Sequence, residues 1–365
     1  MKQRSSAWLL AWLYAGLIVY ASLYPFVGWR LQGVAPTAFL LAPLPQYWTG
    51  FDVLANLVGY ALLGFLLALA LLRSGWVVWA WPAALVLPVL LSLGVETLQN
   101  FLPTRIPSNV DFVLNSAGAW LGAALVLALV RLGALRRWSQ LRADWFLPQA
   151  HGSLVLLALW PLALLYPLSV PFGLGQVVDR LEAGLISWLS DTPFLAWLPV
   201  RVDASVPLSP LAEVLCVALA LLAPLLMGYA DVRTTARRLA FWALFFVCAL
   251  AASGLSSALT YGPSHAWSWI SPTAALGLGL AGGAGLALLA LPRRWCGVFM
   301  LLCLVVSLSL LNGAPASPYF AQSLEVWEQG QFIRFHGLSQ WLGWLWPFAA
   351  LVLGLRAVVS SAPRG

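Results

Sequence analysis

The chain is built from long apolar runs separated by short segments that hold most of its polar residues. A run of about 20 apolar residues is long enough to cross a bilayer as an α-helix. Backbone groups in lipid must be paired within the spanning segment, which favours helices over loops. The runs cover residues 7–26, 52–72, 76–98, 112–132, 153–172, 210–229, 239–260, 272–291, 296–311 and 340–359. We therefore expect an all-α fold, a polytopic transmembrane helical bundle with about ten spans.

The composition agrees with this pattern and excludes a water-soluble globule. Hydrophobic residues make up 62% of the 365 positions and charged residues only 8%, whereas about a quarter of a soluble domain is charged. The 21 tryptophans suit a protein that is anchored at two membrane interfaces. The net charge of +7 is not gathered into a basic, aromatic stripe, so no nucleic-acid partner is expected. Membrane lipids are the expected surroundings of the chain.

The positions of the basic residues predict the orientation of the bundle. If the N-terminus is cytoplasmic, 14 of the 19 Lys and Arg residues lie in cytoplasmic segments. The remaining five lie outside: Arg30, Arg105, Arg180, Arg201 and Arg334. Cytoplasmic loops of membrane proteins carry such an excess of basic residues. An even number of spans then places both termini in the cytoplasm.

The spans are expected to form several domains. Residues 1–133 hold four spans, residues 134–150 a basic interfacial cytoplasmic linker, residues 151–292 four more spans, and residues 293–365 two additional helices. Residues 130–145, which overlap this linker, fit either a basic helix on the inner leaflet or a solvated loop. At offsets of 160 or 161, Glu213 aligns with Asp52, Gly279 with Gly118 and Gly283 with Gly122. Residues 151–292 are therefore either a degenerate second copy of the first unit or a chance match.

Two of the first four spans open with the same polar pattern, D-x3-N-x2-G. Asp52 and Asn56 begin the second span, and Asp111 and Asn115 begin the fourth. Residues four apart stack on one helical face, and an aspartate at a helix start also suits the free N–H groups and the helix dipole. The nearby glycines allow a neighbouring helix to approach closely. These predicted packing glycines are Gly59, Gly64, Gly118 and Gly122.

The third span brings further polar residues to the same predicted outer end. It finishes with Glu96 and Gln99, and a short loop stiffened by two prolines then carries Arg105 towards Asp111. Charged residues within spans are costly and mark functional sites by default. We therefore predict an outward-facing, ligand-binding cluster of Asp52, Asn56, Glu96, Gln99, Arg105, Asp111 and Asn115. The alternative is structural: the aspartates cap their helices and Arg105 only neutralises the acids.

No other recognised chemistry is visible in the sequence. The four cysteines lie in apolar runs without CxxC spacing, so neither a metal site nor a disulfide is expected. GxSxG, HExxH and Walker A motifs are missing, and no GxGxxG stands in a strand-to-helix setting. We expect no cofactor, and no catalytic residue can be assigned.

The ordered polar residues resemble the VanZ-like family. Asp52, Asn56, Gly59 and Tyr60 come first, followed by Glu96 and Gln99, Pro103 and Arg105, and then Asp111, Asn115 and Gly118. The resemblance covers roughly residues 8–132. It implies a multi-pass protein of the bacterial inner membrane, and a named member of the family is linked with resistance to teicoplanin-type glycopeptide antibiotics. It supplies no established catalytic residue.

Three functions follow as hypotheses. The first is a binding or accessory protein of the cell envelope, whose outer cluster handles a lipid-linked or cell-wall-related ligand. The second is a membrane-embedded enzyme that uses paired carboxylates on a lipid-linked substrate. The third is a transporter or channel, although transporter repeats usually place charged sites near the membrane midplane. The first is favoured because the acids lie at helix ends and no nucleophile or metal set accompanies them.

Overall fold

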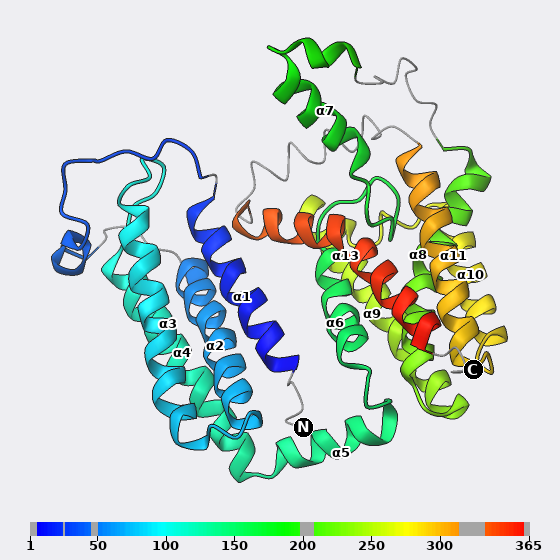
Figure 1. Cartoon of the computed structure of the whole chain (residues 1–365), viewed down its shortest axis with the longest axis horizontal. Helices are drawn as coiled ribbons and strands as arrows, with labels where there is room; N and C mark the ends of the chain where they lie inside the picture. The colour runs from blue at the N-terminus through cyan, green and yellow to red at the C-terminus, as the bar shows by residue number, and fades with distance from the viewer. Residues whose placement is uncertain (1–5, 25, 45–49, 198–207, 314–332, 361–365) are drawn as a thin grey trace. The chain divides into compact units, whose positions relative to one another are not determined.

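The computed structural model describes residues 6–24, 26–44, 50–197, 208–313 and 333–360, and no β-strand occurs among them. The chain divides into two compact units, Met1–Arg142 and Ala143–Gly365, which are described separately below (Figure 1). The all-helical fold that the apolar runs predict is confirmed.

The first unit is built around two helices that run in the same direction. Its elements are α1 (Ser6–Leu23), the short 3-10 helix η1 (Ala38–Leu41), α2 (Gly50–Arg73), α3 (Val77–Gln99) and α4 (Asn109–Arg131). Helix α2 packs most extensively against α4 and also contacts α1 and α3. At one end of the unit the core consists of small apolar residues: Ala68, Ala84, Ala123 and Val126.

Helix α5 (Ala134–Trp145) leaves the first unit, and the boundary between the two units falls within it. None of its residues is buried, and Trp138 and Leu141 are exposed among its arginines. Of the two interpretations of residues 130–145, the helix rather than the solvated loop is therefore confirmed. Contact of this amphipathic helix with the inner leaflet stays a prediction.

The second unit is arranged around a buried central helix. Its elements are α6 (His151–Ala163), α7 (Val178–Leu189), η2 (Pro193–Trp197), α8 (Pro210–Asp231), α9 (Thr235–Tyr261), η3 (Pro263–His265), α10 (Pro272–Ala287), α11 (Arg293–Asn312) and α13 (Ile333–Ser360). Helix α8 packs against α11, α10, α6 and α9, and α13 packs against α6 and α11. Serine caps and an adjacent proline start both α8 (Ser209, Pro210) and α10 (Ser271, Pro272).

The predicted span at residues 153–172 is longer than the helix that forms there. Helix α6 ends at Ala163, and residues 164–177 turn back without helical structure. Two prolines in this stretch, Pro167 and Pro171, have no N–H to donate, and Phe172 has a φ of +64° that a helix does not accept. This stretch is apolar because it forms a buried turn, in which Phe172 and Leu174 lie in the core of the unit.

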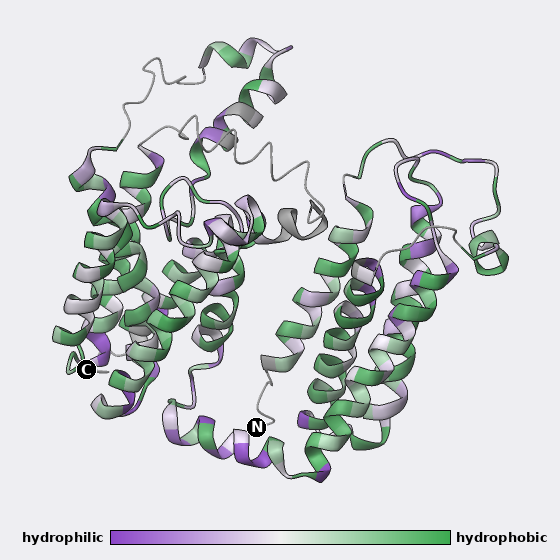
Figure 2. Ribbon diagram, turned by 180° about the vertical axis from the view of Figure 1, so that it is seen from behind, coloured by the Kyte–Doolittle hydropathy of each residue, from purple (hydrophilic) through white to green (hydrophobic). Residues whose placement is uncertain are grey.

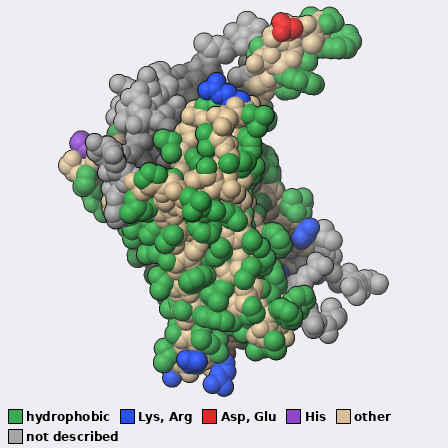
Figure 3. Space-filling view, turned by 90° about the vertical axis from the view of Figure 1, so that its left-hand side faces the viewer, with side chains coloured by type: hydrophobic (Ala, Val, Ile, Leu, Met, Phe, Trp, Pro, Cys, Tyr) green, Lys and Arg blue, Asp and Glu red, His purple; other side chains and the backbone are tan. Residues whose placement is uncertain are grey.

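The helices carry the apolar surface expected of a multi-pass membrane protein. Six of the described helices are long and apolar enough to cross a bilayer, namely those at Asp52–Arg73, Val77–Gln99, Asn109–Arg131, Pro210–Asp231, Thr235–Tyr261 and Arg293–Asn312. Three shorter apolar helices lie at Ala7–Leu23, His151–Ala163 and Pro272–Ala287. Hydrophobic positions run along the helices (Figure 2), and a space-filling view shows a broad hydrophobic surface with basic side chains near its upper and lower ends (Figure 3). The count of ten spans and the side of the termini stay predictions.

Candidate functional site

The close packing of α2 against α4 positions the polar residues at the start of both helices. A Cβ atom at Gly64 would overlap the carbonyl group of Ala119, and one at Gly118 would overlap that of Leu57. Gly122 lies equally close to Ala61. The fourth predicted packing glycine, Gly59, has only the Tyr14 hydroxyl within 4 Å, at 3.9 Å. The backbones of α2 and α4 therefore approach each other through three glycines, and Gly59 lies towards α1.

The predicted acids and amides of α2, α3 and α4 are joined by a chain of hydrogen bonds. Asn56 Nδ2 donates to Asp111 Oδ1 at 2.7 Å. The Asp111 amide donates to the Ser108 hydroxyl at 3.3 Å, and the Ser108 amide donates to Glu96 Oε2 at 2.9 Å. We call Glu96, Ser108, Asp111 and Asn56 the acid–amide chain. Through it the end of α3 is fastened to the starts of α4 and α2.

Arg105 and Gln99 are directed to the end of α1. Arg105 donates from Nε and Nη2 to the carbonyl oxygen of Tyr24, at 3.1 and 2.6 Å, and from Nη2 to that of Ala21 at 3.3 Å. Gln99 Nε2 donates to the Ser22 carbonyl at 3.0 Å. The last carbonyls of a helix have no partner within the helix. One role of these two side chains is therefore to close α1 and bind it to the loop after α3.

A second group of polar side chains lies deeper between α2, α3 and α4. Asn115 Nδ2 donates to the Ser92 hydroxyl at 3.0 Å, and both residues are buried. The hydroxyl of Tyr60, which is also buried, lies beside Ser92 and near Glu96. Within the described part of the chain, neither Tyr60 Oη nor Asn115 Oδ1 meets hydrogen-bond geometry with a partner. Two unsatisfied polar atoms thus lie around Ser92, one helical turn from Glu96.

The remaining acids of the predicted spans lie at comparable positions. Asp52 is in the first turn of α2, one turn before Asn56. Glu213 begins α8 in the second unit and accepts a hydrogen bond from Thr273 of α10 at 2.6 Å. Both units therefore have an acid in the first turn of a helix that packs on a partner helix.

Ser92 and Ser108 belong to the site but were not among its predicted residues. Both had a signal in the sequence. Ser108 stands three residues before Asp111, the spacing of a helix cap, and Ser92 stands four residues before Glu96, on the same helical face. Tyr60 was identified only as part of the family pattern.

The chemistry of this site is that of a hydrogen-bond acceptor. Glu96 is only 3% exposed, and it lies with Asp111 and Asp52 at the ends of helices that converge there. Among the described residues, no group of three or more His, Cys, Asp or Glu side chains could hold a metal ion. The carboxylate oxygens of these acids can accept hydrogen bonds from N–H or O–H groups.

Comparison with known proteins identifies the segment that carries this site. No curated protein and no solved structure matches the chain. Residues 7–131 match the family model described as VanZ/LLP1, and this range contains every residue of the acid–amide chain and of the group around Ser92. Residues 7–131, which form most of the first unit, are thus similar to the VanZ/LLP1 family.

Proposed function

We propose that the protein is a binding or accessory protein of the bacterial inner membrane, and that its first unit binds a polar ligand of the cell envelope on the outer side. The acid–amide chain is the observation that supports this function most directly. It draws polar groups of three helices together at one end of the unit, where a purely structural helix start needs only a local cap.

The chemistry of the cluster favours a ligand that donates hydrogen bonds. Three carboxylates, Asp52, Glu96 and Asp111, lie in the first or last turns of their helices, while Arg105 donates to the carbonyls of α1. Carboxylates accept hydrogen bonds from ammonium and amide groups, and such charge-assisted bonds are the stronger ones. A lipid-linked cell-wall precursor carries a peptide with these groups. An influence on glycopeptide susceptibility follows if the protein sequesters or presents this precursor.

The distribution of polar groups supports binding rather than passage through the unit. Beyond Tyr60 and Asn115, the next turns of α2 and α4 contribute Ala68, Ala123 and Val126 to an apolar core. A channel or transporter would need polar or hydrated groups on both sides of its centre. The apolar core at that end therefore supports binding over passage through the unit.

The experiment uses the full-length protein with Glu96→Gln and Asp111→Asn, which keep the side-chain shapes but remove the charges. Purified protein in nanodiscs is titrated with an undecaprenyl-linked muropeptide precursor. In parallel, teicoplanin susceptibility is measured in a deletion strain that carries each variant. We expect both variants to reach the membrane normally, to bind the precursor at least tenfold more weakly and not to restore the susceptibility of the parent strain.

The control is Asp191→Asn, because Asp191 is exposed in the second unit. Unchanged precursor binding in both variants would refute the proposal. Conversion of the precursor by the parent protein, abolished by Glu96→Gln, would replace binding with the enzymatic hypothesis.

A further inference from the structure

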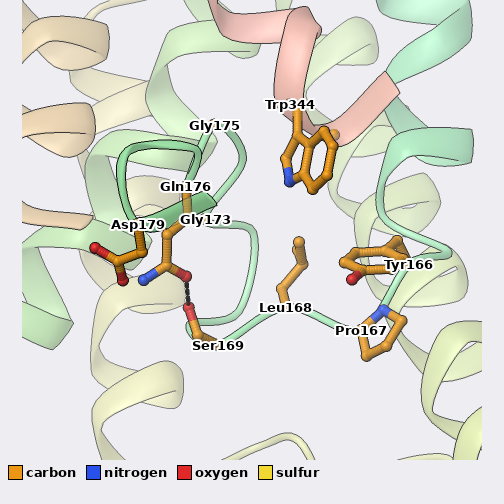
Figure 4. Close-up of a pocket in the computed structure, with 10 residues that line it drawn as sticks. Tyr166, Pro167, Leu168, Ser169, Gly173, Gly175, Gln176, Asp179 and Trp344 are labelled. Carbon is orange, nitrogen blue, oxygen red and sulfur yellow. Dashed lines mark hydrogen bonds between the residues drawn. The ribbon is translucent and has the colours of Figure 1, made fainter. Parts of the chain in front are cut away.

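The second unit contains a hollow that lies outside the VanZ/LLP1 segment. It measures about 130 Å³ and lies between the turn after α6, the start of α7 and helix α13 (Figure 4). Tyr166, Leu168 and Trp344 line one side, and Ser169, Gln176 and Asp179 line the other. One half of the hollow is therefore aromatic and apolar, and the other half is polar and acidic.

Hydrogen bonds from α11 and α13 hold the walls of this hollow in place. Asn312 of α11 accepts from the amides of Val177 and Val178, at 2.9 and 3.1 Å, and donates to the Gly175 carbonyl at 3.0 Å. Gly175 has a φ of +92°, and a Cβ there would lie 2.5 Å from the Leu308 side chain, so only glycine fits this turn.

The polar side chains of the two walls are also held by hydrogen bonds. Gln176 accepts from Ser169 and donates to the Leu311 carbonyl at 3.3 Å. On the other wall, the Tyr166 hydroxyl accepts from Gln340 of α13 at 3.0 Å. The hollow is therefore a formed site rather than a gap in loose packing.

The size and chemistry of the hollow limit what can occupy it. An apolar cavity of about 150 Å³ holds one benzene molecule, so this hollow takes a group of about six non-hydrogen atoms and is too small to enclose a whole sugar ring with its hydroxyls. Tyrosine and tryptophan faces accept both methylene groups and cations. Asp179 lies on the opposite side, beyond the Gln176 side chain (Figure 4), and its negative charge favours a positive end there.

We propose that the hollow between Tyr166, Trp344 and Asp179 binds a short amphipathic amine, with its methylene groups against the aromatic side chains and its ammonium group directed towards the Asp179 side. Either the head group of an aminophospholipid or a free amine supplies this chemistry. The following helix, α7, exposes Leu181, Leu185 and Trp188, as a helix lying on a membrane surface does. The site is independent of the first unit, so its failure would leave the proposed envelope function intact.

The test compares three probes that share one chain and differ in charge: hexylammonium, hexanol and hexanoate. Each is titrated against the full-length protein in nanodiscs, and affinity is read from the shift in unfolding temperature. We expect hexylammonium to bind most tightly and hexanoate most weakly. Hexanoate binding as tightly as hexylammonium, or no binding of any probe, would overturn the proposal.

Two variants separate the contributions of the two halves of the hollow. Asp179→Asn should weaken hexylammonium binding about fivefold, which is the effect of one exposed charge pair, and leave hexanol unchanged. Trp344→Leu should weaken all three probes. The matched controls are Asp191→Asn and Trp188→Leu, both at exposed positions of the same unit. Equal effects in variants and controls would mean that the probes act through the bilayer and would refute the site.

A final arm distinguishes the two sources of the amine. Nanodiscs of phosphatidylethanolamine and of phosphatidylglycerol are compared by native mass spectrometry. Retention of phosphatidylethanolamine by the parent protein, reduced in Asp179→Asn, assigns the site to a lipid. Hexylammonium binding that is equal in both nanodiscs, without retained lipid, assigns it to a free amine. Preferential retention of phosphatidylglycerol contradicts the proposed chemistry.

Discussion

Glu96 and Arg105 are charged residues that hold backbone segments in place. A buried carboxylate is costly unless its oxygens accept hydrogen bonds. Glu96 accepts one from the Ser108 amide, immediately before α4 begins. Arg105 likewise donates to the carbonyls of Tyr24 and Ala21. The acids and amides that meet at the site could be predicted from their spacing, whereas Ser92 and Ser108 were missed. The partners of Arg105 could not be predicted, because backbone carbonyls leave no signal in the sequence.

Replacement of Arg105 tests its part in closing α1. In Arg105→Ala the Tyr24 and Ala21 carbonyls lose their donor, and we expect a loss of about 1 kcal/mol in the free energy of unfolding, since the site is partly exposed to solvent. Thermal unfolding of the purified protein in detergent measures the change. Arg30→Ala removes an exposed arginine nearby in the chain and is the control. Equal unfolding temperatures for the two variants would contradict the role of Arg105.

At the scale of elements, the contact of α2 with α4 decides where the site forms. Glycines let the two backbones meet, and the helix starts that carry Asn56 and Asp111 are thereby brought within hydrogen-bond distance. The glycine spacing in the sequence predicted this close approach for Gly64, Gly118 and Gly122. It could not separate them from Gly59, because helical spacing gives the face of a glycine but not the distance of its neighbour.

Adding one methyl group distinguishes packed glycines from unpacked ones. Gly122→Ala places a Cβ atom against the Ala61 carbonyl and should lower the unfolding temperature and the yield of monodisperse protein. Gly94→Ala in α3, where no atom lies within 4 Å, should be neutral or stabilising because alanine favours helix over glycine. Size-exclusion chromatography and thermal unfolding of both variants measure the difference. Similar behaviour of the two would show that α2 and α4 do not meet through Gly122.

At the scale of the whole molecule, the second copy at residues 151–292 stays a prediction. The helix contacts in the two units nevertheless indicate which residues would correspond if the copy exists. Leu57 meets Gly118 in the first unit, and Val217 meets Gly277 in the second. The sequence alignment instead paired Gly118 with Gly279 and Gly122 with Gly283, yet neither later glycine has an atom within 4 Å. A helix as rich in glycine as α10 offers several registers, and residue identity alone does not choose among them.

The correspondence between the two units can be tested by the same comparison of Gly→Ala variants. If α10 packs on α8 as α4 packs on α2, Gly277→Ala should destabilise the protein as Gly122→Ala does, because its Cβ would meet Val217. Gly279→Ala should resemble Gly94→Ala. Thermal unfolding of the four variants makes the comparison. Destabilisation by Gly279→Ala but not by Gly277→Ala would restore the register read from the sequence.

The orientation of the whole molecule decides what the acid–amide chain can reach. The excess of basic residues predicts that the loop after α1 is outside and the end of α4 inside. In a variant without native cysteines, Leu31→Cys should react with an impermeant maleimide on intact cells, because Leu31 is exposed in that loop. Leu132→Cys, which is also exposed, at the end of α4, should react only after permeabilisation. The reverse pattern would place Glu96 and Asp111 on the cytoplasmic side, where no cell-wall ligand outside the membrane could bind them, and the proposed function would fail with it.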